Sequence, residues 1–406
     1  MELAAKILNG LNICKPQKKF LLNLFTAILT AHGKINFRNL SRFSTVSEKT
    51  YSRQYAKAFA FEAFNRQVIE AGLENKGERI IVIDASFVKK SGKATYGLDR
   101  FWNGCHRRCE KGLEVSSIAI VDVVRNTGFT LSVRQSDPLH DQTKASGSKA
   151  KAKADQNKTA ATKQKKKKRT ADSKKKKAKK TQEDETLVDQ YLQHLKDVAP
   201  NLLECKKYVV GDGYFSKQKF VDGVRDLDLH QIGKLRCDAN MRFLYTGPKR
   251  AHGSGRQKVY DGKVNWQDLS RFDLIETQDG IAIYSLVLNH VSLKRNVKIV
   301  VLVAETKEGK KKYALLFSTD TDLDAKTIVR YYKARFQIEF LFRDAKQFTG
   351  LCDCQARDKQ RLDFHFNASL TTLNLAKLEH LKTLSDCDAV PFSMASIKAC
   401  YFNDFF

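Results

Sequence analysis

The first 75 residues carry apolar side chains at helical spacing. Residues 18–33, KKFLLNLFTAILTAHG, repeat apolar positions every three or four residues, which predicts a helix with Gly33 as its C-cap. Residues 35–59 then predict a short helix, a turn at Ser44–Thr45 and a second helix capped by Ser47. We therefore expect a helical domain over residues 1–75.

The second of these helices would expose the basic side chains Lys49, Arg53 and Lys57. Two interpretations fit this spacing. The pair is either a helix-turn-helix whose basic second helix enters a major groove, or an ordinary helical hairpin. The spacing alone does not separate them.

From Arg79 the pattern changes to short apolar runs, which predict strands. Three strands are expected at RIIVIDASFVKK (79–90), VSSIAIVDVVRN (115–126) and GFTLSVRQ (128–135), with a two-residue turn at Thr127–Gly128 between the last two. Further along, a helix, a strand, a helix and a strand are expected at ETLVDQYLQHLKDV (185–198), KYVVGDGYFS (207–216), KQKFVDGVRD (217–226) and HQIGKLR (230–236). This order predicts an α/β fold, a mixed sheet with helices packed on it.

The rest of the chain divides into a β-rich part and a helical part. Residues 238–312 are rich in β-branched residues, Gly, Lys and Arg without a long helical period, so we interpret them as a β-rich insertion. A strand at 312–319 is followed by one long helix up to Lys346, capped by Thr321 or Asp322, and by another helix over 363–384. The predicted core of sheet and helices is therefore divided into three segments, 76–140, 183–237 and 313–406. A lysine-rich loop (141–182) separates the first two, and the β-rich insertion separates the second from the third.

The distribution of charge along the chain indicates what kind of partner it binds. The 406 residues carry a formal net charge of +28, and residues 144–180 contribute 17 lysines and arginines against two aspartates, a balance of +15. This lysine-rich segment has almost no apolar residues, so it is expected to be disordered. It either holds DNA nonspecifically or is a tolerated insertion without a role of its own. The remaining residues still carry +13, which favours a polyanion such as nucleic acid as partner.

Other compositional signals point to a reducing compartment and away from membranes. No apolar run reaches the ~20 residues of a membrane span, and the start MELAAKILNG lacks the features of a signal peptide. Nine cysteines at irregular spacing do not form a disulfide pattern. We expect a cytoplasmic protein with free thiols.

The segment YYKARFQIEFLFRDAK (331–346) places charge among aromatic residues. On one straight helix, about 100° per residue would bring Tyr332, Arg335, Glu339 and Lys346 within roughly 60° of the circumference. Such a narrow charged seam is expected to meet a charged partner.

Two carboxylates follow buried strands and could meet this seam. Asp84 comes after IIVI and Asp212 after KYVVG. A lone buried carboxylate is costly, so each is either a helix cap or a metal ligand. Asp212 suits both roles, whereas an extended segment after Asp84 makes a cap there less suitable. Together with Glu339 they form an oxygen ligand set suited to Mg²⁺.

These residues carry a resemblance to a known family. The order Tyr332, Arg335, Glu339, Lys346 is similar to the Y-R-E-K signature of bacterial insertion-sequence transposases of the DDE type, in the IS-four (Tn-five-like) group. The segments IDASFVKKSGKATYGLDRFWNGC (83–105) and VVGDGYFSK (209–217) resemble the family's two aspartate blocks, and the likeness covers roughly residues 40–400.

The resemblance implies a fold, a reaction and a cofactor. The fold would be an RNase H-like mixed sheet interrupted by the β-rich insertion and preceded by the helical DNA-binding domain. Asp84, Asp212 and Glu339 would be the catalytic triad and would hold two Mg²⁺ ions, with Mn²⁺ as a substitute. The reaction would cut the phosphodiester at a transposon end and join the freed 3′-hydroxyl to target DNA. The alternative is a decayed, catalytically inactive transposase that only binds DNA.

The partners would be double-stranded DNA, as terminal repeats and as target, and a second copy of the chain in the DNA complex. Tyr332, Arg335 and Lys346 would contact phosphates of the transposon end. Trp266 would either hold a flipped base or be a core aromatic. Basic residues of the insertion, among them Arg236, Arg242 and Arg256, would either grip DNA or simply be solvated. The end YFNDFF (401–406) is shorter than in relatives, which puts the pairing of two copies in question.

Overall fold

The structure is a computed structural model that describes residues 1–73, 77–138, 186–202, 207–248, 255–305, 311–383 and 391–405. The expected lysine-rich loop at 141–182 lies outside these residues. Within the described ranges, none of the helices combines the length and apolar character needed to cross a bilayer.

The N-terminal segment forms helices, as predicted. They are α1 (Glu2–Gly10), α2 (Lys15–Thr30), α3 (Phe37–Leu40), α4 (Glu48–Tyr55) and α5 (Phe61–Gly72). Ser47 caps α4, because its hydroxyl accepts the N–H of Thr50 at 3.3 Å. The predicted cap at Gly33 is wrong: α2 ends at Thr30, Ala31 is extended, and Gly33 (φ 78°) serves the following turn.

One mixed sheet of twelve strands runs through the described chain. Its first six strands are β1 (Arg79–Lys89), β2 (Asp99–Asn103), β3 (Arg108–Asp122), β4 (Thr127–Gln135), β5 (Tyr208–Val210) and β6 (His230–Leu235). The other six are β7 (Met241–Leu244), β8 (Tyr260–Lys263), β9 (Asp273–Gln278), β10 (Ile281–His290), β11 (Arg295–Glu305) and β12 (Lys311–Ser318). The order is β2-β3-β1-β5-β6-β12-β11-β10-β7-β8, with β4 also paired to β3 and β9 to β10. β1, β5 and β6 are parallel, and the other pairs are antiparallel.

The β3–β4 turn lies earlier than the sequence pattern predicts. Asp122 pairs with Thr127, so the turn occupies 123–126 and the predicted turn residues belong to β4. The Asp122 carboxylate accepts the N–H groups of Val124 and Arg125 at 3.0 and 2.9 Å, and Asn126 adopts φ 48°. An aspartate that bonds the backbone two and three residues on starts a turn efficiently. β2 is a further strand that the pattern did not predict.

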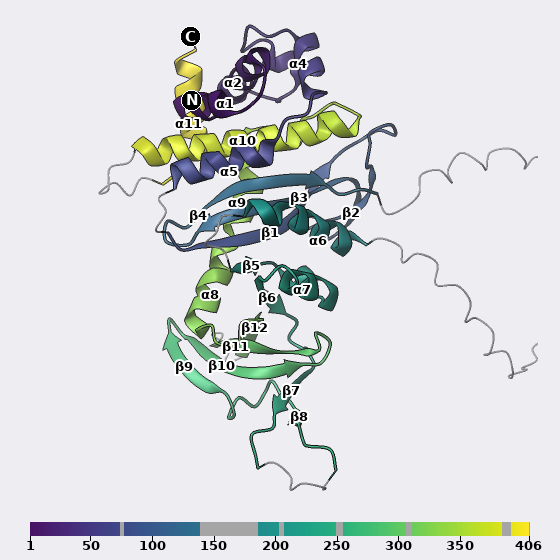
Figure 1. Cartoon of the computed structure of the whole chain (residues 1–406), viewed down its shortest axis with the longest axis vertical. Coiled ribbons are helices and arrows are strands. Elements are labelled where there is room, and N and C mark those ends of the chain that lie inside the picture. The colour runs from purple at the N-terminus through teal and green to yellow at the C-terminus, as the bar shows by residue number, and fades with distance from the viewer. Residues whose placement is uncertain are drawn as a thin grey trace, which may run out of the picture.

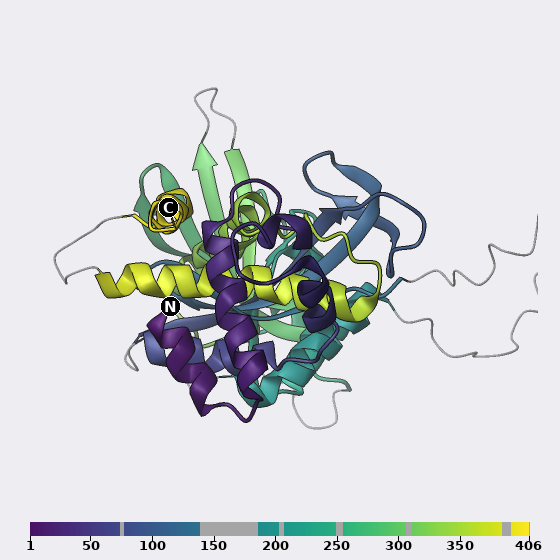
Figure 2. The same cartoon turned by 90° about the horizontal axis from the view of Figure 1, so that it is seen from above.

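Helices cover both faces of the first half of the sheet (Figures 1 and 2). The remaining helices are α6 (Leu187–Val198), α7 (Gln218–Arg225), α8 (Ala325–Ala334), α9 (Gln337–Phe348), α10 (Lys359–Thr383) and α11 (Met394–Asn403), and two short 3₁₀ helices are η2 (Ala199–Asn201) and η3 (Gly213–Phe215). Alternate residues of β1 enter different cores. Ile81 and Ile83 pack in the cluster that contains α5, α6 and α7 residues, whereas Ile80 and Val82 pack in the cluster of α8 and α9.

The single long helix predicted up to Lys346 is wrong: it is broken in two, so the four residues of the charged seam do not lie along one straight helix. α8 ends at Ala334 and α9 begins at Gln337. At the junction Phe336, Ile338 and Glu339 donate to carbonyls three residues back instead of four, at 3.0–3.2 Å. Such a 3₁₀ turn changes the helix direction. The cap also differs: Asp324, rather than Thr321 or Asp322, accepts the N–H of Thr327 at 3.0 Å.

The free edge of β4 is covered by polar side chains of α10. Asn374 accepts the N–H of Thr130 at 2.9 Å and donates to its carbonyl at 2.7 Å, and Lys377 donates to the Gly128 carbonyl at 3.1 Å. Pairing these backbone groups blocks edge-to-edge association of the strand. It also fixes α10 on the sheet that carries the site described below.

We predict that acid destabilises the fold partly through His194 on α6. This buried ring lies between the hydroxyls of Ser116 and Ser132, at 2.8 and 3.0 Å, and burial lowers its pKa to about 3. In the unfolded chain the pKa returns to 6.5, so the unfolded state binds the extra proton and stability falls as pH drops from about 6.5 toward 3.

Urea unfolding at pH 7, 6 and 5 tests this. The free energy of unfolding of wild type should lose about 1 kcal/mol more per pH unit than that of His194→Gln. Equal pH slopes for the two proteins would contradict the assignment.

Candidate active site

The parallel pair β1–β5 places two aspartates side by side. Val82 pairs with Val210, and each strand has its aspartate two residues further on, Asp84 and Asp212. Because residues in register on parallel strands share a face, both carboxylates continue the side of Val82 and Val210. That side belongs to the cluster of α8 and α9. β5 ends at Val210, so Asp212 lies just beyond the strand.

Each aspartate is also tied to its own backbone. The Asp84 carboxylate accepts the N–H of Ala85 at 2.8 Å. Asp212 caps the 3₁₀ helix η3 by accepting the N–H of Tyr214 at 2.8 Å. The two roles that the sequence left open for Asp212 are therefore compatible: it is a cap, and it faces Asp84 closely enough to influence its protonation.

Arg335, at the junction of α8 and α9, lies between the carboxylates of Asp84 and Glu339. One Arg335 nitrogen lies 3.4 Å from the Asp84 carboxylate, and the other lies 2.7 Å from that of Glu339. Only 7% of the Arg335 side chain is exposed, against 46% of Glu339. The guanidinium also lies over the ring of Tyr332, 5.5 Å from its centroid. Asp84 on β1, Tyr332 and Arg335 at the end of α8, and Glu339 on α9 therefore lie together with Asp212 in one site.

Asp84 is strongly perturbed. Burial and then the negative charge of Asp212 raise its pKa to about 7, although the charge of Arg335 opposes the shift. This shift indicates that the site contains too little positive charge to balance two neighbouring, partly buried carboxylates. Arg335 alone does not balance them, because it is shared with Glu339.

The donor set suits a hard divalent cation. Asp84 and Asp212 present carboxylate oxygens on the same side of neighbouring strands, the ligand type that Mg²⁺ prefers. Among the described residues, however, no three His, Cys, Asp or Glu side chains already form a metal-binding group. The ion pairs of Arg335 explain this, since the guanidinium lies between Asp84 and Glu339. Asp84 and Asp212 could hold a metal directly, and Glu339 could join them if Arg335 moved.

The other predicted contact residues lie outside this cluster. Lys346 is in the last turn of α9, where its charge partly offsets the rise that burial causes in the pKa of the Cys352 thiol. Arg236, just after β6, is exposed and pairs with Asp238 at 2.9 Å. Arg242 on β7 lies over the ring of Tyr260 at 5.1 Å.

The two remaining predicted residues belong to the β-rich part of the chain. Arg256 is exposed between β7 and β8. Trp266 is half-buried, donates to the Ala239 carbonyl at 3.1 Å and packs near Phe272. Its surroundings correspond to the core interpretation of this tryptophan.

Lys217 is a neighbour of the site that the sequence pattern did not single out. Its ammonium lies 3.6 Å from the centroid of the Tyr214 ring, and burial lowers its pKa while the nearby Asp212 opposes the change. The only signal was its position at the end of VVGDGYFSK (209–217). Lys217 is therefore a second cation beside the carboxylates, in addition to Arg335.

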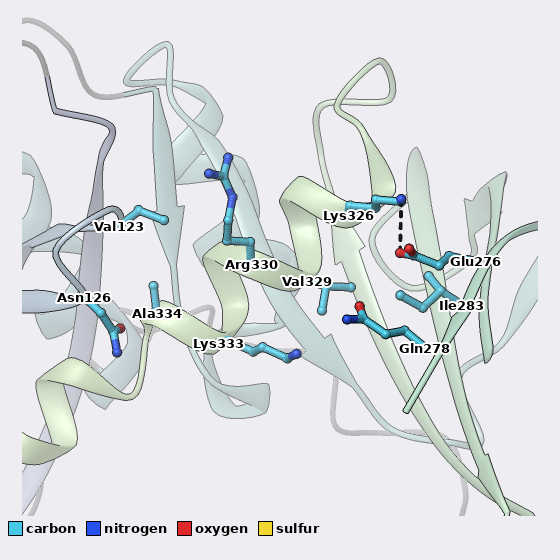
Figure 3. A pocket seen from close by; sticks show the side chains of 10 residues that line it. All are labelled: Val123, Asn126, Glu276, Gln278, Ile283, Lys326, Val329, Arg330, Lys333 and Ala334. Carbon is cyan, nitrogen blue, oxygen red and sulfur yellow. Dashed lines mark ion pairs between the residues drawn. The ribbon is translucent and has the colours of Figure 1, made fainter. Parts of the chain in front are cut away.

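The opposite face of α8 lines a separate hollow of about 440 Å³ (Figure 3). Lys326 and Arg330 on its wall are paired, with Glu276 at 3.1 Å and Glu78 at 2.7 Å, respectively. Figure 3 shows the Lys326–Glu276 pair as a dashed line between α8 and β9. Two of its three cationic side chains are therefore already paired, which leaves little positive charge in this hollow for an anion.

Comparison with known proteins identifies one family. A family model described as DDE superfamily endonuclease matches residues 17–278, more than half of the chain. The matched stretch includes Asp84 and Asp212 and ends before Glu339. No curated protein matches the chain.

We predict that Arg335 competes with a cation for the acids. In Arg335→Gln the Asp84 and Glu339 carboxylates lose their buried charged partner, so Mn²⁺ should bind roughly tenfold more tightly, the equivalent of one charged hydrogen bond. Isothermal titration calorimetry without DNA measures this directly, with Arg335→Lys as the charge-retaining control. Unchanged or weaker binding in Arg335→Gln would refute the competition.

Proposed function

Because the chain belongs to the DDE superfamily of endonucleases, we propose that it is a transposase of the insertion-sequence type, with Asp84, Asp212 and Glu339 as its catalytic carboxylates. It cuts DNA at the ends of its own element and joins them to a target. The family implies an endonuclease acting on DNA; transposition is our further step.

The observation that carries the proposal is the placement of Asp84 and Asp212. They occupy matching positions beyond the paired ends of β1 and β5, and burial together with the negative charge of Asp212 raises the pKa of Asp84. A structural role would be served better by pairing each acid fully. Adjacent buried carboxylates short of positive charge are typical of a metal-dependent phosphoryl-transfer site.

The strand order supports an RNase H-like core. The order β4-β3-β1-β5-β6, with β1, β5 and β6 parallel, has antiparallel strands on one side and parallel strands with crossover helices on the other. On this interpretation β7–β11 are the β-rich insertion between the second aspartate and the glutamate.

The helices of residues 1–73 are then the DNA-binding domain. Lys49, Arg53 and Lys57 are exposed on and just after α4, which favours a contact of this helix with the duplex. Arg236, Arg242 and Arg256 would extend the contact along the β-rich part. We further propose that two copies of the chain act together in the DNA complex.

The residues of the site have separate tasks. Asp84, Asp212 and Glu339 would hold Mg²⁺, with Mn²⁺ as a substitute. When bound, such ions activate an attacking oxygen and stabilise the leaving oxygen at phosphorus. Arg335 and Tyr332 bind and orient the phosphate. Burial raises the pKa of Tyr332, so its hydroxyl stays protonated and can donate to a phosphate oxygen.

The proposed reaction proceeds in two in-line displacements. In the first, water attacks phosphorus at the element boundary, the P–O bond to the 3′ oxygen breaks, and a 3′-hydroxyl is released. In the second, that hydroxyl attacks a phosphodiester of the target and displaces its 3′ oxygen. The positive charge of Arg335 counteracts the negative charge that develops on the phosphate oxygens in both.

Cleavage of the chain's own flanking DNA tests the proposal. Labelled duplexes from both sides of its coding sequence should be cut at a defined boundary only when Mg²⁺ or Mn²⁺ is present. Glu339→Gln should bind the same duplex and cut it at least 10²-fold more slowly, since it lacks one charged ligand. Glu276→Gln, which removes an acid outside the site, is the matched control and should cut at the wild-type rate.

Binding without cutting by wild type would replace the proposal with a DNA-binding protein derived from a transposase. Equal cutting by wild type and Glu339→Gln would remove Glu339 from the site.

A further inference from the structure

A basic hollow of about 450 Å³ opens where β1 ends. Three segments far apart in sequence line it: residue Lys34 between α2 and α3, the residues that end and follow β1, and those that follow α9. Five cationic side chains line it against a single carboxylate. They are Lys34, Lys89, Lys90, Lys93 and Arg357, with Asp353 as the acid.

Most of this positive charge is unmatched. The Asp353 carboxylate accepts the N–H of Ile35 at 2.8 Å, and Lys90 donates to the Cys354 carbonyl, so both have structural tasks. The other cations, Lys34, Lys89, Lys93 and Arg357, are exposed, and none forms an ion pair with a carboxylate of the described chain. In the hollow of Figure 3, by contrast, two of the cations are paired.

The charge continues from this hollow toward the N-terminal helices. A neighbouring hollow of about 380 Å³ shares Lys34 and adds Arg38 and Arg42, at α3 and just after it. A basic track therefore runs from the region of α3 to the end of β1. A small anion would need one such hollow, whereas a line of cations matches the regular spacing of a phosphate backbone.

The track leads to the acids along β1. Five residues of strand separate Asp84 from Lys89, roughly 16 Å at about 3.3 Å per residue. This corresponds to about five base pairs of B-DNA at 3.4 Å per pair.

We propose that this basic hollow binds the phosphate backbone of duplex DNA about five base pairs from the phosphodiester held at the acids. The proposal rests on the function proposed above and adds the course of the duplex between the acids and the N-terminal helices. It gives Lys34, Lys89 and Lys93 a role in holding DNA that is independent of the chemistry.

Lysine acetylation with and without DNA tests the proposal on the full chain. The wild-type protein is treated with an acetylating reagent without divalent metal, alone or with a 30-base-pair duplex from its flanking DNA, and lysine modification is measured by mass spectrometry. The duplex should lower the modification of Lys34, Lys89 and Lys93 severalfold. Lys196, exposed in the last turn of α6, should stay equally reactive and serves as internal control.

Three results would overturn the proposal. Unchanged reactivity of Lys34, Lys89 and Lys93 in a protein that binds and cuts the duplex would reject the hollow and leave the proposed function intact. Equal protection by pyrophosphate alone would show a small-anion site instead. A protein that neither binds nor cuts its flanking DNA would reject the proposed function together with this inference.

Salt dependence gives a second, quantitative readout. Each phosphate contact contributes about 0.9 to the slope of log affinity against log salt concentration. Lys89→Ala/Lys93→Ala should therefore reduce that slope by about 2, and the matched pair Lys196→Ala/Lys207→Ala should leave it unchanged. A double variant with the wild-type slope would contradict the proposed contacts.

Discussion

The repulsion between Asp84 and Asp212 is the constraint on which the rest of the site depends. Two neighbouring parallel strands end their pairing at the same level, and each places a carboxylate two residues beyond it. A fold selected only for stability would separate these charges or neutralise both. Here burial and the neighbouring charge raise the pKa of Asp84 to about 7. A proton or a cation relieves this repulsion, and Arg335 is the cation that the chain places beside Asp84.

The break between α8 and α9 determines how that cation arrives. In a continuous helix the direction of α9 would follow that of α8, whereas here the regular bonding ladder ends with the Arg335 N–H, which donates to the Tyr331 carbonyl at 3.2 Å. The 3₁₀ turn at the junction instead leaves Arg335 between Asp84 and Glu339 while both helices keep their apolar faces on the sheet. Arg335 thereby connects the charge of the two acids to the junction between the helices.

The sequence predicted most of the elements, because these depend on local patterns, although β2 was not predicted. Short apolar runs located β1 and β5, and the acids that follow them were singled out as candidates for one site. The break at Arg335–Phe336 was not predictable, since the pattern on either side of it is helical and no Pro or Gly marks it. The basic hollow was missed because its residues come from separate segments, which only the folded chain brings together. Lys217 follows Asp212 in the same segment, but no pattern marked it as part of the site.

The most direct test of this account is the position of a bound ion. Crystals grown with Mn²⁺ and a DNA duplex would reveal the metal by its anomalous scattering. The account predicts a peak between the carboxylates of Asp84 and Asp212, with the Arg335 guanidinium displaced from Asp84 toward a phosphate. An anomalous peak only at other residues, with the Arg335 ion pairs intact and DNA bound, would contradict it.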